Sequence, residues 1–255
     1  MRGLLSLAQE SFRRLDERAL GETVRVLADE FAQELADRER SLAGRALTLT
    51  LGWHALTLFH CRGREALQLI RAQAKEALAV ALTIGRREKP EDLNRLVVNA
   101  LSGILQLQVY APELEPVVTP GRGAEILGEL TDSLSPGELR HLYRSWFEFG
   151  QLAHYLAFYA HLRGHPREEE LFAGLVELTG TDYRTVDPSA MGAAITRSTR
   201  RREGAFFFEY LAVDALARKR PSEAAGYLKL AALAFPLPPW NLLRQRLAER
   251  LSGSA

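Results

Sequence analysis

The six histidines are the side chains of this sequence best suited to metal chemistry. Glu138 and His141 have the spacing of half a carboxylate-bridged diiron motif, but such a site needs a second motif and two further inward-facing glutamates. Farther along the same expected helix, His154 and His161 lie well around the axis from His141, because each residue advances the helix by about 100°. A helical-bundle metal enzyme is therefore the least favoured function, and we expect no metal, cofactor or catalytic residue.

One cysteine and a group of arginines complete the candidates for chemistry. Cys61 follows His60, but neighbouring helical side chains diverge and no third member completes a catalytic set, so we expect a buried thiol. The strongest positive cluster consists of Arg184, Arg197, Arg200, Arg201 and Arg202. Such guanidinium groups can hold phosphate or an acidic partner in bidentate fashion, which makes a nucleic-acid or anion site the alternative. A solvated helix end accounts for the same pattern and is the favoured interpretation.

The composition is typical of a globular protein with a sizeable core. The chain has 255 residues, of which 47% are hydrophobic and 25% are charged, enough for one large or two ordinary domains. Its 33 basic and 32 acidic side chains nearly cancel, so no global field draws it to nucleic acid or an anionic membrane. A single cysteine excludes an intramolecular disulfide, and no apolar run is long enough for a signal peptide or a membrane span. We expect a cytoplasmic protein without a membrane partner.

Apolar periodicity and helix-capping residues predict an all-α fold, because no stretch shows the sustained alternation of a strand. We expect helices over residues 3–20, 22–40, 124–134, 136–163, 166–180 and 191–203, one from Pro90, one from Trp240, and hairpins over 41–85 and 206–236. The hairpin over 41–85 is expected to turn near Arg62 and Gly63. The proline- and glycine-rich loop over 111–123 then separates an N-terminal helical subdomain, residues 1–110, from a C-terminal helical-hairpin subdomain, residues 124–255.

The hairpin over 206–236 carries a motif of apolar, small and proline residues: Phe208, Leu211, Ala212, Ala215, Ala224, Leu228, Ala231 and Pro236. Their order and spacing resemble one tetratricopeptide repeat, with Ala215 where that family prefers tyrosine and Lys219 where its turn often has glycine. The turn RGHPRE from Arg163 matches RKRPSE from Arg218 after a shift of 55 residues, and HCRGRE from His60 matches HLRGHP after a shift of 101. The resemblance implies stacked hairpins in a curved α-solenoid. A compact helical bundle is the alternative.

The resemblance also implies a concave groove lined by the first helix of each hairpin. In the last hairpin its positions are Phe206, Glu209, Val213 and Leu216, and the two shifts place Gln151, His154, Phe158, His161, Thr50, Trp53, Thr57 and His60 beside them. Aromatic anchors with hydrogen-bonding groups suit a peptide. The same residues are equally consistent with packing between neighbouring helices.

These observations favour a non-enzymatic scaffold or regulatory adaptor that binds a protein or peptide in a helical groove. A nucleic-acid-associated subunit that uses the arginine cluster is the alternative, and a metal enzyme comes third.

Overall fold

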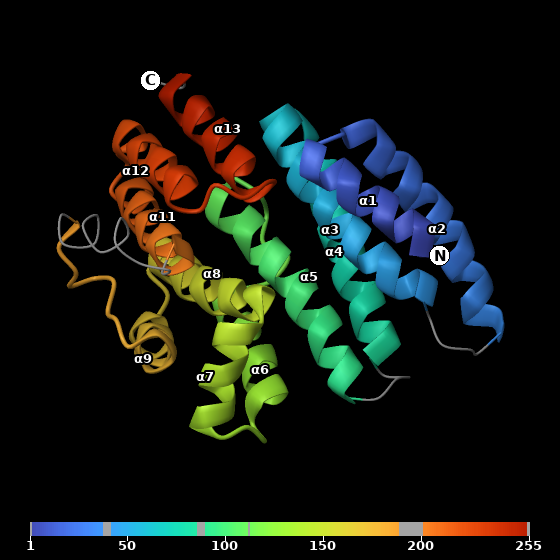
Figure 1. Ribbon diagram of the computed structural model, residues 1–255, viewed down its shortest axis with the longest axis horizontal. Coiled ribbons are helices and arrows are strands. Elements are labelled where there is room, and N and C mark those ends of the chain that lie inside the picture. Colours follow the sequence, from blue (N-terminus) through green and yellow to red (C-terminus); the bar gives the residue numbers. More distant parts are fainter. Residues whose placement is uncertain (1, 38–41, 86–89, 112, 189–200, 254–255) are drawn as a thin grey trace. The chain divides into compact units, whose positions relative to one another are not determined.

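The computed structural model describes residues 2–37, 42–85, 90–111, 113–188 and 201–253 (Figure 1). Every regular element within these ranges is a helix, so the predicted all-α class is confirmed. The chain divides into two units, Met1–Thr119 and Pro120–Ala255, and the division falls inside the loop expected over 111–123.

The N-terminal unit is organised around one helix that is buried for most of its length. The described elements of this unit are α1 (Arg2–Arg14), α2 (Glu17–Asp37), α3 (Leu42–Arg62), the 3₁₀ helix η1 (Gly63–Ala66), α4 (Leu67–Gly85) and α5 (Pro90–Tyr110). The buried helix is α3. α3 packs against α1, α2, α4 and α5 (Figure 1). The predicted turn at Arg62 and Gly63 is confirmed, since α3 ends at Arg62 and Gly63 has a φ of 58°.

The boundary between the first two helices lies earlier in the chain than the sequence predicts. The expected boundary near residue 21 is wrong: α1 ends at Arg14 and Gly21 lies within α2. Leu15 has a φ of 54°, its N–H donates to the Phe12 carbonyl, and the Asp16 N–H donates to the Ser11 carbonyl. This is the hydrogen-bond pattern of a Schellman helix end, with leucine where glycine is usual. The Asp16 carboxylate then accepts the Ala19 N–H and starts α2.

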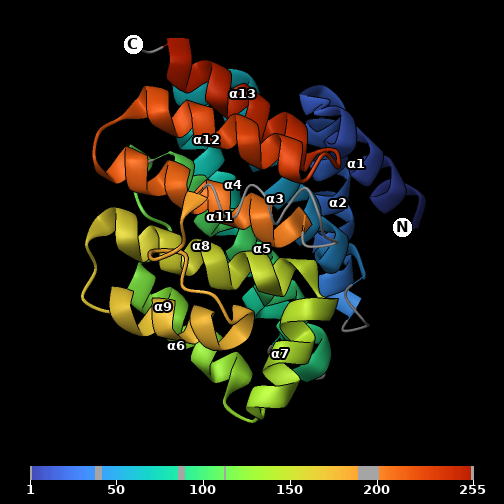
Figure 2. The same ribbon diagram turned by 60° about the vertical axis from the view of Figure 1, so that its left-hand side comes forward.

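In the C-terminal unit, one helix, α8, contacts more of the other described helices than any other element does. The described elements of this unit are α6 (Pro120–Thr131), α7 (Pro136–Ser145), α8 (Phe147–Arg163), α9 (Glu168–Thr179), α11 (Arg201–Ala217), α12 (Pro221–Ala234) and α13 (Trp240–Gly253). α8 packs on one side against α11, which is followed by α12 and α13, while α6 and α9 pack on other parts of α8 (Figure 2). α8 is buried from Phe149 to Ala160 because apolar residues surround its axis.

The helix expected over 136–163 is two helices, which is a correction. Its start is as predicted: Ser135 and Glu138 form a capping box, in which the Ser135 hydroxyl accepts the Glu138 N–H and the Glu138 carboxylate accepts the Ser135 N–H. Trp146 is extended, with φ −121° and ψ 110°, and ends α7. The bend lets Phe147 join an aromatic cluster with Phe206, Phe235 and Trp240.

The last hairpin is confirmed as α11 and α12, with Pro221 in the first turn of α12. Lys219 has a φ of 59° and closes a Schellman end, because its N–H donates to Leu216 and the Arg220 N–H donates to Ala215. Residues 191–200 of the helix expected over 191–203 lie outside the described residues, and α11 begins at Arg201.

Candidate functional site

The residues expected to line a concave groove lie mostly in the interior. Eight of the ten are buried, namely Thr50, Thr57, His60, Gln151, His154, Phe158, Glu209 and Val213. Trp53 and His161 are partly exposed, and Trp53 stacks on Phe12 at a ring-centroid distance of 5.5 Å. The expectation that all ten face an accessible groove is therefore wrong for the buried eight, which pack between neighbouring helices.

Glu209 takes part in a buried ion pair that connects three helices. Its carboxylate accepts hydrogen bonds from Arg244 Nε of α13, at 3.1 Å, and from the Tyr155 hydroxyl of α8, at 3.0 Å. The two charged side chains are 0% and 4% exposed. Water cannot stabilise either charge there, so each depends on the other. Sequence reasoning missed Arg244, because nothing in the final helix distinguishes it from its exposed neighbours.

His154 is held as a neutral imidazole. Its Nδ1–H donates to the Gly150 carbonyl at 2.7 Å, so Nε2 is left to accept from the Tyr183 hydroxyl at 3.0 Å. The ring stacks on Phe206, with centroids 3.9 Å apart. Burial lowers the pKa of His154 to about 3, and burial likewise raises the pKa of Tyr183 well above its usual value. His154 is thus a packing and hydrogen-bonding residue that stays uncharged at neutral pH.

His161 joins the helix pair α8–α9 to α11. Its Nδ1 lies 2.7 Å from a Glu168 carboxylate oxygen, and its Nε2 lies 3.2 Å from Asp214. A carboxylate accepts hydrogen bonds, so both interactions form together when both ring nitrogens carry protons. Asp214 is also paired with Arg218. The cluster holds α9 in place at one end.

The two arginines of the predicted cluster whose side chains the structure describes, Arg184 and Arg202, interact with other residues of the chain. Arg184 is bonded to Asp182 and Glu169, and its guanidinium lies over the Phe172 ring at 4.8 Å. Arg202 donates to the Tyr143 carbonyl at 2.7 Å and lies over three aromatic rings. Arg197 and Arg200 lie outside the described residues, as does the side chain of Arg201. The anion site therefore stays a prediction.

The remaining candidates for chemistry are Glu138, His141 and Cys61. Glu138 and His141 are exposed on α7, and Glu138 is used as a helix cap. Within the described ranges no three histidine, cysteine or acidic side chains are placed to hold a metal ion. The expectation of a buried thiol is wrong, because Cys61 is exposed and its Sγ lies 3.9 Å from the Leu15 carbonyl oxygen.

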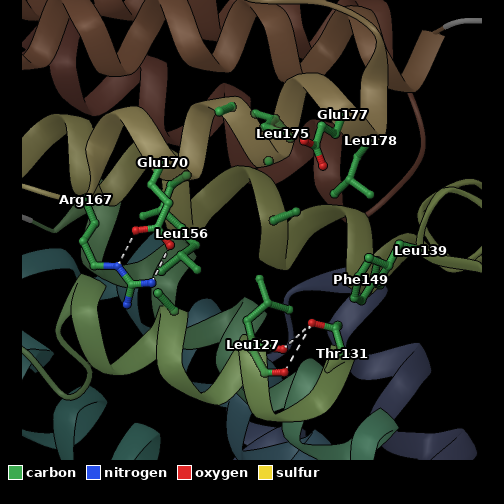
Figure 3. Close-up of a pocket in the computed structure, with 16 residues that line it drawn as sticks. Leu127, Thr131, Leu139, Phe149, Leu156, Arg167, Glu170, Leu175, Glu177 and Leu178 are labelled. Atoms are coloured by element: carbon green, nitrogen blue, oxygen red, sulfur yellow. Dashed lines mark hydrogen bonds and ion pairs between the residues drawn. The ribbon is translucent and has the colours of Figure 1, made fainter. Parts of the chain in front are cut away.

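The C-terminal unit contains an apolar pocket of about 480 Å³ (Figure 3). We call it the α6–α9 pocket, because α6 and α9 form its two sides; α8 forms its floor, and Leu139 of α7 lies at one end. The side and floor residues are mostly apolar or small: Ala124, Leu127, Gly128, Thr131, Phe149, Ala153, Leu156, Leu171, Gly174, Leu175 and Leu178. Its volume lies within the range of roughly 300–1,000 Å³ that is typical of ligand sites.

The pocket is deep because small residues occupy positions where large ones would fill it. Ala153 lies on the floor, one turn from Phe149 and one from Leu156, and its methyl group leaves space between these two larger side chains. Gly128 and Gly174 are exposed on the two sides, and a Cβ added at either would meet nothing within 4 Å. On α6 the small residues Ala124 and Gly128 are four apart and share one helix face, a signal present in the sequence that the groove prediction did not use.

Charged residues border α9 along one flank. Arg167 donates to both oxygens of Glu170, at 2.8 and 2.5 Å, and this bond raises the pKa of Arg167 and lowers that of Glu170. Glu177 lies seven residues farther along the same flank, toward the end marked by Leu139 (Figure 3). Within the described part of the chain its carboxylate forms no ion pair. The pocket therefore has a neutralised end and an acidic end.

A scan against protein-family models and searches of curated proteins and solved structures found no match to this chain. The tetratricopeptide-repeat resemblance consequently stays a prediction. None of the helices in the described ranges is long and apolar enough to cross a membrane.

Proposed function

We propose that this protein is a non-enzymatic scaffold of stacked helical hairpins that binds a peptide segment of a partner protein in the α6–α9 pocket. The observation that carries the proposal is an accessible, mostly apolar cavity between two helices, whose charged lining residues all lie along α9. Apolar side chains of a peptide gain free energy by leaving water, at about 25 cal/mol per Å² of buried apolar surface. The pocket takes the place of the concave groove implied by the tetratricopeptide-repeat resemblance.

The succession of α11, α12 and α13 supports a solenoid-like arrangement of this part of the unit over a compact bundle, because these helices pack chiefly on their neighbours in that order. A single cysteine, exposed on the surface, suits the reducing cytoplasm, where we place the scaffold.

The proposal is tested by filling the pocket without weakening the fold. Gly174→Leu adds a side chain at an exposed helical position whose added Cβ meets no atom within 4 Å, and leucine favours a helix more than glycine does. We expect helical peptides selected on the wild-type protein from a displayed random library to bind Gly174→Leu at least tenfold more weakly, by fluorescence anisotropy.

Gly226→Leu is the matched control, because Gly226 is an exposed glycine of α12 with equal free space and lies outside the pocket. This variant should bind the selected peptides as the wild type does. Equal binding by all three proteins would exclude the α6–α9 pocket as the peptide site. A library from which no specific peptide is enriched would count against peptide binding altogether.

A further inference from the structure

The geometry points to one class of occupant for the α6–α9 pocket: a short amphipathic helix with a lysine or arginine on the flank that faces Glu177. This inference rests on the proposed function and deepens it. Three features carry it, namely the two-helix border of the pocket, the small residues on that border, and the Glu177 carboxylate at one end, which has no ion-pair partner within the described residues.

The border of the pocket favours a helix as the bound form. The contacting stripe of α6 runs from Ala124 to Thr131, which at 1.5 Å per residue extends about 10 Å, or two helical turns. A peptide helix of matching length presents apolar side chains at i, i+3 or i+4, and i+7. Gly128 and Gly174 have no side chain, so the backbone of such a helix can approach α6 and α9 closely.

Charge complementarity determines which charged residues the bound helix should carry. The charge of Arg167 is neutralised by Glu170, and the negative charge of Glu125 of α6 also attracts Arg167. That end of the pocket therefore offers no free positive charge to an acidic ligand. Glu177 at the other end has no ion-pair partner in the described part of the chain. A bound acidic helix would place like charges together there, whereas a basic residue would form an exposed ion pair.

Two synthetic helical peptides of equal length test the inference. Both carry the same leucines at i, i+3, i+4 and i+7, and they differ only in having lysine or glutamate at the flanking positions. We expect the lysine peptide to bind the wild-type protein about fivefold more tightly in low salt, with the preference shrinking at high salt because the pair is exposed.

Glu177→Lys should weaken the lysine peptide about fivefold and reverse the preference between the two peptides. The matched control is Glu249→Lys, at an exposed glutamate of α13 that likewise has no ion-pair partner within the described residues; it should change neither peptide more than twofold.

The outcomes separate this inference from the proposed function. In one outcome, the two peptides bind the wild type with equal affinity, bind Glu177→Lys unchanged and fail to bind Gly174→Leu. That result would contradict the preference for a basic helix and would still support peptide binding in the pocket. If neither peptide binds while a library-selected peptide does, the basic helix is wrong as the occupant. If only a neutral long-chain alcohol binds in a manner blocked by Gly174→Leu, the pocket is a small-molecule site and both proposals fall.

Discussion

At the scale of single residues, His154 shows how burial decides the charge of a side chain. The imidazole is 0% exposed, and both of its nitrogens are bonded in a pattern that fits the neutral form. Protonation in the folded protein would break the hydrogen bond that Tyr183 donates to Nε2, and it would place a positive charge where water cannot solvate it. The pKa of His154 is therefore lowered from 6.5 to about 3.

This shift predicts an acid-dependent loss of stability. Below pH 6.5 the unfolded chain binds a proton at His154 that the folded chain does not bind until about pH 3, so the free energy of unfolding falls as the pH falls through this window. Between pH 7 and pH 5, this effect of His154 lowers the free energy of unfolding by about 2 kcal/mol. Denaturant unfolding at the two pH values should therefore show that His154→Asn loses about 2 kcal/mol less than the wild type.

The exposed His141 supplies the control for this measurement. His141→Gln should keep the wild-type difference between the two pH values. If His154→Asn and the wild type lose equal stability on acidification, His154 is not held neutral in the folded protein.

The groove prediction shows what residue spacing alone can establish. The shifts of 55 and 101 residues placed side chains such as Phe158 and Val213 on equivalent positions, but they contained no information on what covers those positions. Tyr183, from the loop after α9, lies on His154 and removes it from solvent. The sequence did carry one relevant signal, since Tyr155 and Tyr159 make α8 apolar on its other side as well, and a helix that is apolar all round is buried.

At the scale of the helices, boundaries marked by a capping residue were easier to predict than boundaries without one. Ser135, with Glu138 three residues later, is a capping signal that can be read locally, and the structure confirms it. The end of α1 at Leu15 and the break at Trp146 carry no glycine or proline. Both depend on tertiary packing, because Leu15 is buried in a left-handed conformation and the bend at Trp146 directs Phe147 into the aromatic cluster.

The link between α11 and α13 leads to a prediction on stability. Arg244→Met removes the cation that balances Glu209 and leaves a fully buried carboxylate, which still accepts the hydrogen bond from the Tyr155 hydroxyl. We expect a loss of about 3–5 kcal/mol in the free energy of unfolding, measured by chemical denaturation.

The double variant Glu209→Leu, Arg244→Met should recover most of this loss, because two apolar side chains of similar length replace the pair without stranding a charge. A double variant no more stable than Arg244→Met would show that the packing of the arginine, rather than its charge, holds α13 on α11.

At the scale of the whole molecule, the α6–α9 pocket belongs to one unit. All of its lining residues lie between Ala124 and Leu178, inside Pro120–Ala255. Helix periodicity predicted both α6 and α9, yet the space between them depends on how each packs on α8, which no local pattern encodes. The pocket therefore had to come from the structure, although the sequence predicts helices over all of its lining residues.

The same location predicts that the C-terminal unit binds peptide by itself. A fragment of residues 120–255 has a size usual for a single domain and keeps the core around α8, so we expect it to fold, as judged by circular dichroism and cooperative unfolding. Its affinity for a peptide selected on the full chain should stay within twofold, because no lining residue is lost. A fragment of residues 132–255, which lacks α6, should lose that binding, since one side of the pocket is gone. A folded 120–255 fragment without affinity for the peptide would show that residues before Pro120 take part in the site.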